Sequence, residues 1–113
     1  MLGKAHPLPK STDFNETLLR AVDDGLLVPG EIVRVAIYAR IERSYRLKRE
    51  EIPEKFPTFD RALRELLGEA AVVLERVIAK NLYSALSLSF TRHDAWSLVD
   101  YVNNARAAPR RTA

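Results

Sequence analysis

The stretch "LLVPGEIVRVAIYARIERSYRL", residues 26–47, decides the fold that this sequence predicts. Between about Gly30 and Tyr45 it carries apolar residues at four-residue spacing, which is the period of one helix face: Val33, Ile37, Ile41 and Tyr45. Further apolar residues occupy nearly every other side of the first turns: Ile32, Val35, Ala36, Tyr38 and Ala39. A helix that is apolar all round is normally enclosed by its neighbours. We therefore expect residues 32–45 to form the central helix of a bundle, with the C-terminal end emerging toward solvent.

Four other segments have a helical apolar period, and they cover about residues 13–24, 59–67, 69–85 and 94–105. Gly25 and Gly68 follow two of these segments and are typical stop signals. Short polar side chains stand where the helices are expected to begin: Thr12 or Asp13, Thr58, and Thr91 or Asp94. In residues 69–85 the same period places three charged residues outside: Glu75, Arg76 and Lys80. The sequence thus predicts an all-α fold class, a compact bundle of about five helices.

The charged stretch "YRLKREEIPEKF", residues 45–56, predicts a connection between two helices. Its positive and negative charges nearly cancel. Three apolar residues spaced through it can fasten it to the core: Leu47, Ile52 and Phe56. Pro53 and Pro57 prevent a regular helix from continuing through it.

The remaining segments are expected to be irregular. "LSLSF", residues 86–90, alternates as a strand does, but a single strand has no sheet to join, so we expect a short extended link. Residues 1–11 hold two prolines and are expected to form a flexible arm, while residues 107–113 are expected to form a basic tail. A single helical domain would then span residues 12–106.

Composition favours one globular domain, because the 113 residues are 47% apolar and 29% charged. The net charge of +3 arises at the two ends, which hold five of the 18 basic residues and no acidic residue, so the rest is slightly acidic. The chain has no apolar run of about 18 residues and no leading secretion signal, so we expect a cytoplasmic protein. Arginine outnumbers lysine and cysteine is absent, a composition typical of proteins from hot environments.

Residues suited to catalysis are few. The two histidines are His6 in the expected arm and His93, which precedes Asp94 at an expected helix start. Asp23-Asp24-Gly25 lacks the further oxygen ligands of a calcium loop, and the glycines form no phosphate-binding loop. We therefore expect no catalytic residue, metal ion or cofactor, although an enzyme stays the third alternative.

Two binding hypotheses remain. The first is a protein partner or a second copy in a homodimer, held by apolar residues near the C-terminus: Leu88, Phe90, Trp96 and Tyr101. The second is nucleic acid or the ribosome, held by a cluster of cations: Arg40, Arg43, Arg46, Lys48 and Arg49. Glutamates interrupt that cluster, and we therefore prefer the protein partner.

Three stretches resemble the Nitrosopumilus output domain, a small archaeal family. They are "AVDDGLLVPGEIVRVAIYARIERSYRLKREEIPEKF", "FDRALRELLG" and "VLERVIAKNLYSALSLSF", which lie within residues 18–90. The family pattern has a "LG-E-hydrophobic-AIY" helix, a "GLKxEEIPxxP" connector and a "VIExLIxKxLY" helix. The resemblance implies a non-enzymatic helical interaction or output domain in signalling proteins, with no catalytic residues to carry over.

Overall fold

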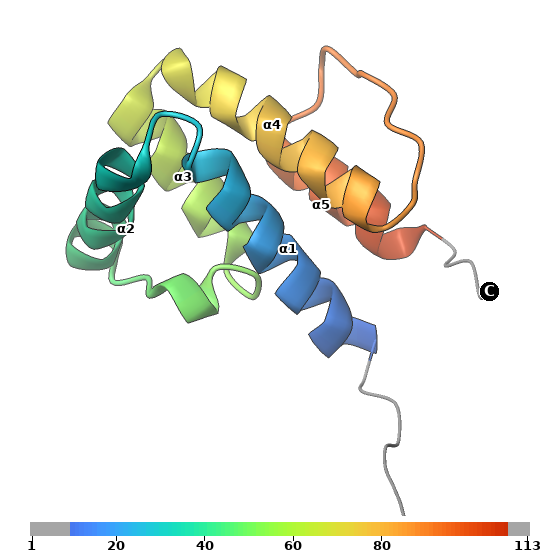
Figure 1. The fold of residues 1–113 in the computed structure, drawn as a ribbon, viewed down its shortest axis with the longest axis horizontal. Coiled ribbons are helices and arrows are strands. Elements are labelled where there is room, and N and C mark those ends of the chain that lie inside the picture. Colours follow the sequence, from blue (N-terminus) through green and yellow to red (C-terminus); the bar gives the residue numbers. More distant parts are fainter. Residues whose placement is uncertain (1–9, 109–113) are drawn as a thin grey trace, which may run out of the picture.

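The computed structural model describes residues 10–108, with side chains from residue 13 onward. Within this range it contains five α-helices and a short 3-10 helix (Figure 1). They are α1 (Lys10–Leu26), α2 (Glu31–Tyr45), η2 (Arg49–Glu51), α3 (Phe56–Leu67), α4 (Ala70–Ala85) and α5 (Leu98–Ala107). No strand occurs among these residues, so the predicted all-α bundle is confirmed.

The centre of the bundle is the pair α1 and α4, which run side by side in opposite directions (Figure 1). Their packing depends on Gly25, because a Cβ atom there would lie only 2.4 Å from Cγ1 of Ile78. We expected Gly25 to stop the first helix, and this was wrong, since α1 continues to Leu26. The glycine serves close helix packing rather than a turn.

Helices α3 and α5 also pack against α4. Each presents a stripe of fully buried apolar residues: Phe59, Ala62 and Leu63 from α3, and Leu98, Val102 and Ala105 from α5. These meet the buried faces of the central pair: Phe14, Leu18 and Val22 from α1, and Ala71, Ile78 and Leu82 from α4. One continuous core therefore links these four helices, and α2 joins it through Ile37 and Ile41.

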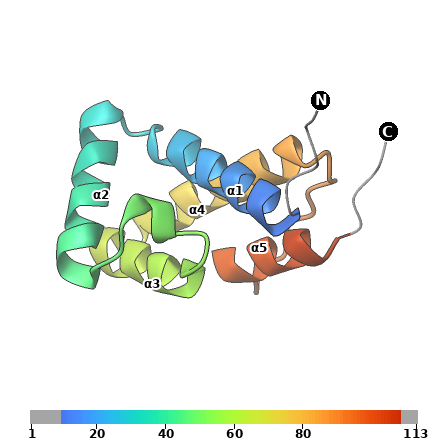
Figure 2. The same cartoon turned by 90° about the horizontal axis from the view of Figure 1, so that it is seen from below.

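Helix α2 is not the central helix, and that prediction was wrong. It lies at one edge of the bundle, as Figure 2 shows, where it packs on α1 and α3. Ile37 and Ile41 are buried, at 5% and 1% exposure, but Ile32 is 85% exposed. Helix α4 has neighbours on more sides, so it takes the central place, and α2 can bury only one of its two apolar faces.

The connection from α2 to α3 is fastened as predicted, because Leu47, Ile52 and Phe56 are all buried. Helix α3, however, begins at Phe56 and not after Thr58. Pro57 lies in its first turn, where a missing N–H group breaks no helical hydrogen bond. Proline therefore starts this helix instead of preceding it.

The segment after α4 is irregular, as expected, with a turn at Leu86 and Ser87 and no regular structure over residues 88–93. Helix α5 begins later than expected, because Ser97 is its N-cap. The Ser97 hydroxyl accepts a hydrogen bond from the backbone N–H of Asp100, and the Asp100 carboxylate accepts one from that of Ser97. Neither Thr91 nor Asp94 caps the helix.

The two predicted termini lie mostly outside the described residues, which exclude 1–9 and 109–113. Where they overlap, α1 already begins at Lys10 and α5 ends at Ala107. Over the described part of the chain, no helix combines the length and the apolar character needed to cross a bilayer.

Candidate functional site

The outer face of α2 is an uncovered apolar surface. Its members recur at three- and four-residue spacing, so they share one side of the helix, and all are exposed: Ile32, Val35, Ala36 and Ala39. Val35 is 56% exposed, and Ile32 is the most exposed large apolar residue identified. We call these four residues the α2 outer face.

The turn before α2 adds two more exposed apolar side chains, Leu27 and Val28. The opposite side of the helix carries Ile37 and Ile41, which join the core. Helix α2 thus has two apolar faces in one sequence, and the bundle covers only the inner one. Scattered surface valines are ordinary, but a run of apolar residues on one helix face is a candidate contact surface.

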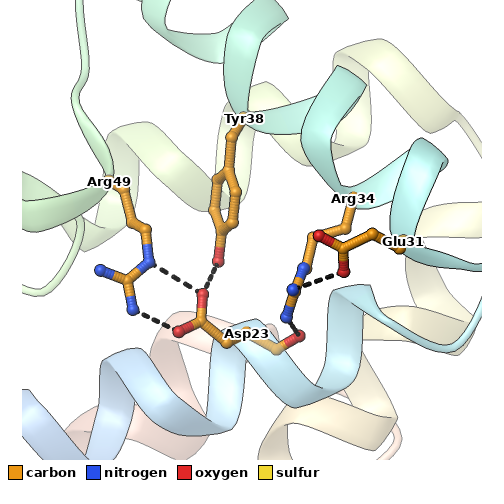
Figure 3. Close-up of polar contacts among 5 residues, drawn as sticks. All are labelled: Asp23, Glu31, Arg34, Tyr38 and Arg49. Carbon is orange, nitrogen blue, oxygen red and sulfur yellow. Dashed lines mark hydrogen bonds and ion pairs between the residues drawn. The ribbon is translucent and has the colours of Figure 1, made fainter.

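A polar cluster around Asp23 fixes α2 against α1 (Figure 3). The hydroxyl of Tyr38 donates a hydrogen bond to Oδ1 of Asp23 at 2.5 Å. Arg49 donates from Nε to the same oxygen at 2.9 Å and from its terminal nitrogen to Oδ2. One carboxylate therefore joins α1, α2 and the η2 connector.

Arg34 adds a second link at the same place. One terminal nitrogen donates to the backbone carbonyl of Asp23 at 3.2 Å, and the other pairs with the Glu31 carboxylate at 2.5 Å (Figure 3). The Asp23 carbonyl lies in the last turn of α1, where carbonyl groups lack helical partners. The N-terminal half of α2, which carries the outer face, is thereby held in one position.

The electrostatics of this cluster indicate a structural role. Burial opposes ionisation of Asp23, but hydrogen bonds from Arg49 and Tyr38 outweigh it, so its pKa lies below the usual value for a carboxyl group. Burial and the neighbouring Asp23 carboxylate raise the pKa of Tyr38 well above its ordinary value. The carboxylate stays charged and the phenol stays neutral at physiological pH, and each is already engaged by the other.

The predicted polyanion contacts do not form one uniform surface. Arg49 is engaged by Asp23, and Nε of Arg40 donates to the Ser44 hydroxyl at 3.2 Å. Arg43, Arg46 and Lys48 are exposed, and the exposed residues Glu42 and Glu50 flank them in the sequence. The pairing of Arg49 was missed because its partner lies 26 residues away and no local pattern indicates it.

The predicted partner residues Leu88, Phe90, Trp96 and Tyr101 are brought together, but largely against their own chain. The rings of Phe90 and Tyr101 stack with centroids 5.3 Å apart, and Trp96 lies 5.0 Å from Tyr101. Leu88 packs on the core, and all four side chains are half-buried. This cluster covers α4 and α5.

Glu75 was expected to face solvent, and that prediction was wrong. It is 8% exposed and lies beside another buried carboxyl group, Asp60. Nε of Arg64 lies 3.3 Å from Oδ1 of Asp60 and 3.4 Å from Oε2 of Glu75. The apolar period of α4 could not reveal this, because both partners of Glu75 belong to α3.

Over the described residues, no group of three or more His, Asp or Glu side chains could hold a metal ion. Comparison with known families, curated proteins and solved structures found no match. The fold and the surface together define a small all-α domain with one uncovered apolar helix face.

Proposed function

We propose that this protein is a non-enzymatic interaction module that forms a homodimer through the α2 outer face. The supporting observation is that a helix with apolar residues on two sides lies at the edge of the bundle, where only one side is covered. A second copy of the same chain supplies the missing cover. The resemblance to signalling-output domains supports a role in which this association transmits a signal.

Burial of this face would contribute useful free energy. Full burial of a valine or isoleucine side chain stabilises by about 1.5 to 3 kcal/mol, and Ile32 and Val35 start largely exposed. Ala36 and Ala39 are small enough to let a second helix approach to about 8 Å. The α2 outer face thus combines large side chains at one end with a close-approach site in its middle.

The charges beside this face favour a parallel pair of α2 helices. At about 100° per residue, Glu42 falls on one flank of the face and Arg40 falls on the other, while Arg43 lies at the C-terminal end of the face itself. A two-fold axis parallel to the helices places Glu42 of each copy opposite the flank that bears Arg40 of the other. In an antiparallel pair the flank bearing Glu31 and Glu42 would face itself, which is unfavourable.

The size of the surface sets the expected affinity. Helix α2 has 15 residues and is therefore about 22 Å long. One such helix pair is smaller than a standard interface, which buries about 800 Å² per partner. We therefore expect a reversible dimer with a dissociation constant on the order of micromolar.

The test is the molar mass in solution. Sedimentation equilibrium of the full chain should show twice the 12.8 kDa monomer at concentrations above the dissociation constant. Val35→Asp should weaken dimerisation at least about tenfold, because a charge would be buried in the contact. Val73→Asp is the matched control, since Val73 is also an exposed helical valine, at 61%, but lies on α4.

Two results would contradict the proposal. A parent protein that stays monomeric up to about millimolar concentration has no dimer of the expected strength. Equal effects of Val35→Asp and Val73→Asp would place the contact somewhere other than the α2 outer face.

A further inference from the structure

A pocket of about 270 Å³ opens between α4, the loop before α5, and the first turns of α5. Glu75 is the most buried polar residue of its lining, and the half-buried rings of Trp96 and Tyr101 form part of its wall. The pocket is separate from the α2 outer face, because none of its lining residues belongs to α2. A ligand of this pocket would therefore bind apart from the proposed dimer contact.

The buried charges at Glu75 do not balance. Asp60 and Glu75 are both buried carboxyl groups, and they share one guanidinium, that of Arg64. Burial and the hydrogen bond with Asp60 raise the pKa of Glu75 to about 8. Within this group of three, one negative charge lacks a cation, so a proton is retained unless another positive charge arrives.

The two arginines at the rim of the pocket do not neutralise the negative charge of Glu75. Nε of Arg92 pairs with Oδ1 of Asp94 at 2.9 Å, so these two largely neutralise each other. Arg76 also lines the pocket, but its side chain is exposed and forms no ion pair with Glu75, whose cation is Arg64. The negative charge that lacks a cation therefore lies at Glu75, inside the pocket.

The aromatic wall suits a cation. The rings of Trp96 and Tyr101 lie 5.0 Å apart at 67°, and His93 stacks on Trp96 at 3.8 Å. Indole and phenol rings attract cations through their electron-rich faces, and aromatic cages bind quaternary ammonium groups. His93 covers one face of Trp96 and Phe90 one face of Tyr101, so a cation would approach each ring from its other side or its rim. A volume of about 270 Å³ is below that of a drug-sized site and fits a small ligand.

We propose that this pocket binds a small organic cation of the ammonium class, with its positive charge at Glu75 and its alkyl groups against Trp96 and Tyr101. No covalent step is involved. The cation takes the place of the proton retained at Glu75, which leaves to solvent, and the aromatic rings replace part of the hydration shell of the cation.

The test uses choline and its neutral isostere 3,3-dimethylbutan-1-ol, which have the same shape but differ in charge. Trp96 is the only tryptophan of the chain, so its indole N–H resonance reports on this pocket alone. Titration at pH 8.5 and constant ionic strength should shift that resonance saturably with choline. The alcohol should bind at least about tenfold more weakly.

Two variants locate the charge. Glu75→Gln keeps the shape of the protonated side chain and should weaken choline binding at least about tenfold. Glu69→Gln is the matched control, because Glu69 is an exposed carboxylate just before α4 and does not line the pocket, and it should change binding less than about threefold. Circular dichroism establishes that each variant is folded.

The outcomes decide the proposal without reference to dimerisation. No saturable shift with choline, an equal response to the alcohol, or unchanged binding by folded Glu75→Gln would each overturn it. If Glu75→Gln does not fold, the comparison of choline with the alcohol on the parent protein still decides. Val35→Asp should bind choline as the parent does, which separates this site from the α2 outer face.

Discussion

Arg49 of the η2 connector binds both carboxylate oxygens of Asp23 on α1, although 26 residues separate the two in the sequence. Tyr38 of α2 donates to the same carboxylate, so three segments meet at one charged group. The position of α2 at the edge of the bundle therefore depends on a polar contact as well as on Ile37 and Ile41.

Removal of this contact should destabilise the fold. Asp23→Ala leaves Tyr38 and Arg49 without their acceptor, and we expect a loss of about 1 to 3 kcal/mol in the free energy of unfolding, measured with urea. Tyr38→Phe removes one hydrogen bond to a charged group and should cost about 1 to 2 kcal/mol. Additive effects of Asp23→Ala and Tyr38→Phe in the double variant would contradict the coupling.

The close approach of α1 and α4 gives a second prediction. Gly25→Ala should destabilise by about 1 to 3 kcal/mol, because the new methyl group would overlap Cγ1 of Ile78, and this exceeds the gain of about 1 kcal/mol from alanine's helix propensity. In an Ile78→Ala background the same substitution should be neutral or stabilising. Thermal unfolding of the four proteins measures both effects, and a stabilising Gly25→Ala in the parent would refute the packing argument.

The pKa of Glu75 predicts how stability changes with pH. Its value of about 8 in the folded protein exceeds the ordinary 4.5, so between these values the folded state binds more protons than the unfolded state. Stability should therefore fall as the pH rises through this window. We expect a loss of about 2 to 3 kcal/mol between pH 5.5 and 8.5, because each pKa unit corresponds to about 1.4 kcal/mol and relaxation of the folded protein reduces the total. The other shifted carboxylates titrate below the window, because their pKa values are lowered.

Glu75→Gln tests the source of that dependence. The amide carries no titratable proton, so the variant should match the parent near pH 5.5 and exceed its stability at pH 8.5. The substitution leaves Arg64 and Asp60 unchanged, so parent and variant differ only in the titratable group at position 75. Urea unfolding at the two pH values measures the difference, and an equal pH dependence of parent and variant would assign it to another group.

Local sequence was sufficient to predict the helices and the fastened connector. The period of "FDRALRELL" places Phe59 and Leu63 inside, and the structure buries both. Leu47, Ile52 and Phe56 likewise needed no knowledge of distant residues. Local signals failed where the sequence allowed two outcomes. Gly25 can stop a helix or let another helix approach closely, and it does the second. More than one residue before α5 can serve as its N-cap, and Ser97 rather than Asp94 does so.

The candidate sites were less accessible to sequence reasoning. The apolar character of residues 32–39 was noted, but from it we inferred enclosure within the chain, whereas the structure leaves Ile32 and Val35 exposed. Trp96 and Tyr101 were identified as binding candidates, while the buried Glu75 beside them was expected outside. In both places the result depends on which helix lies opposite, and periodicity along one segment carries no such information.

The sequence alone determined that this chain forms a helical bundle, because helix periods, prolines and glycines act over a few neighbouring residues. Only the tertiary structure decided that α1 and α4, not α2, form the centre, since the choice depends on how the apolar faces of all five helices fit together. The same packing left one apolar side of α2 in water and placed two carboxyl groups beside a single arginine. Contacts between residues far apart in the chain produced both features, and such contacts exist only once the chain has folded.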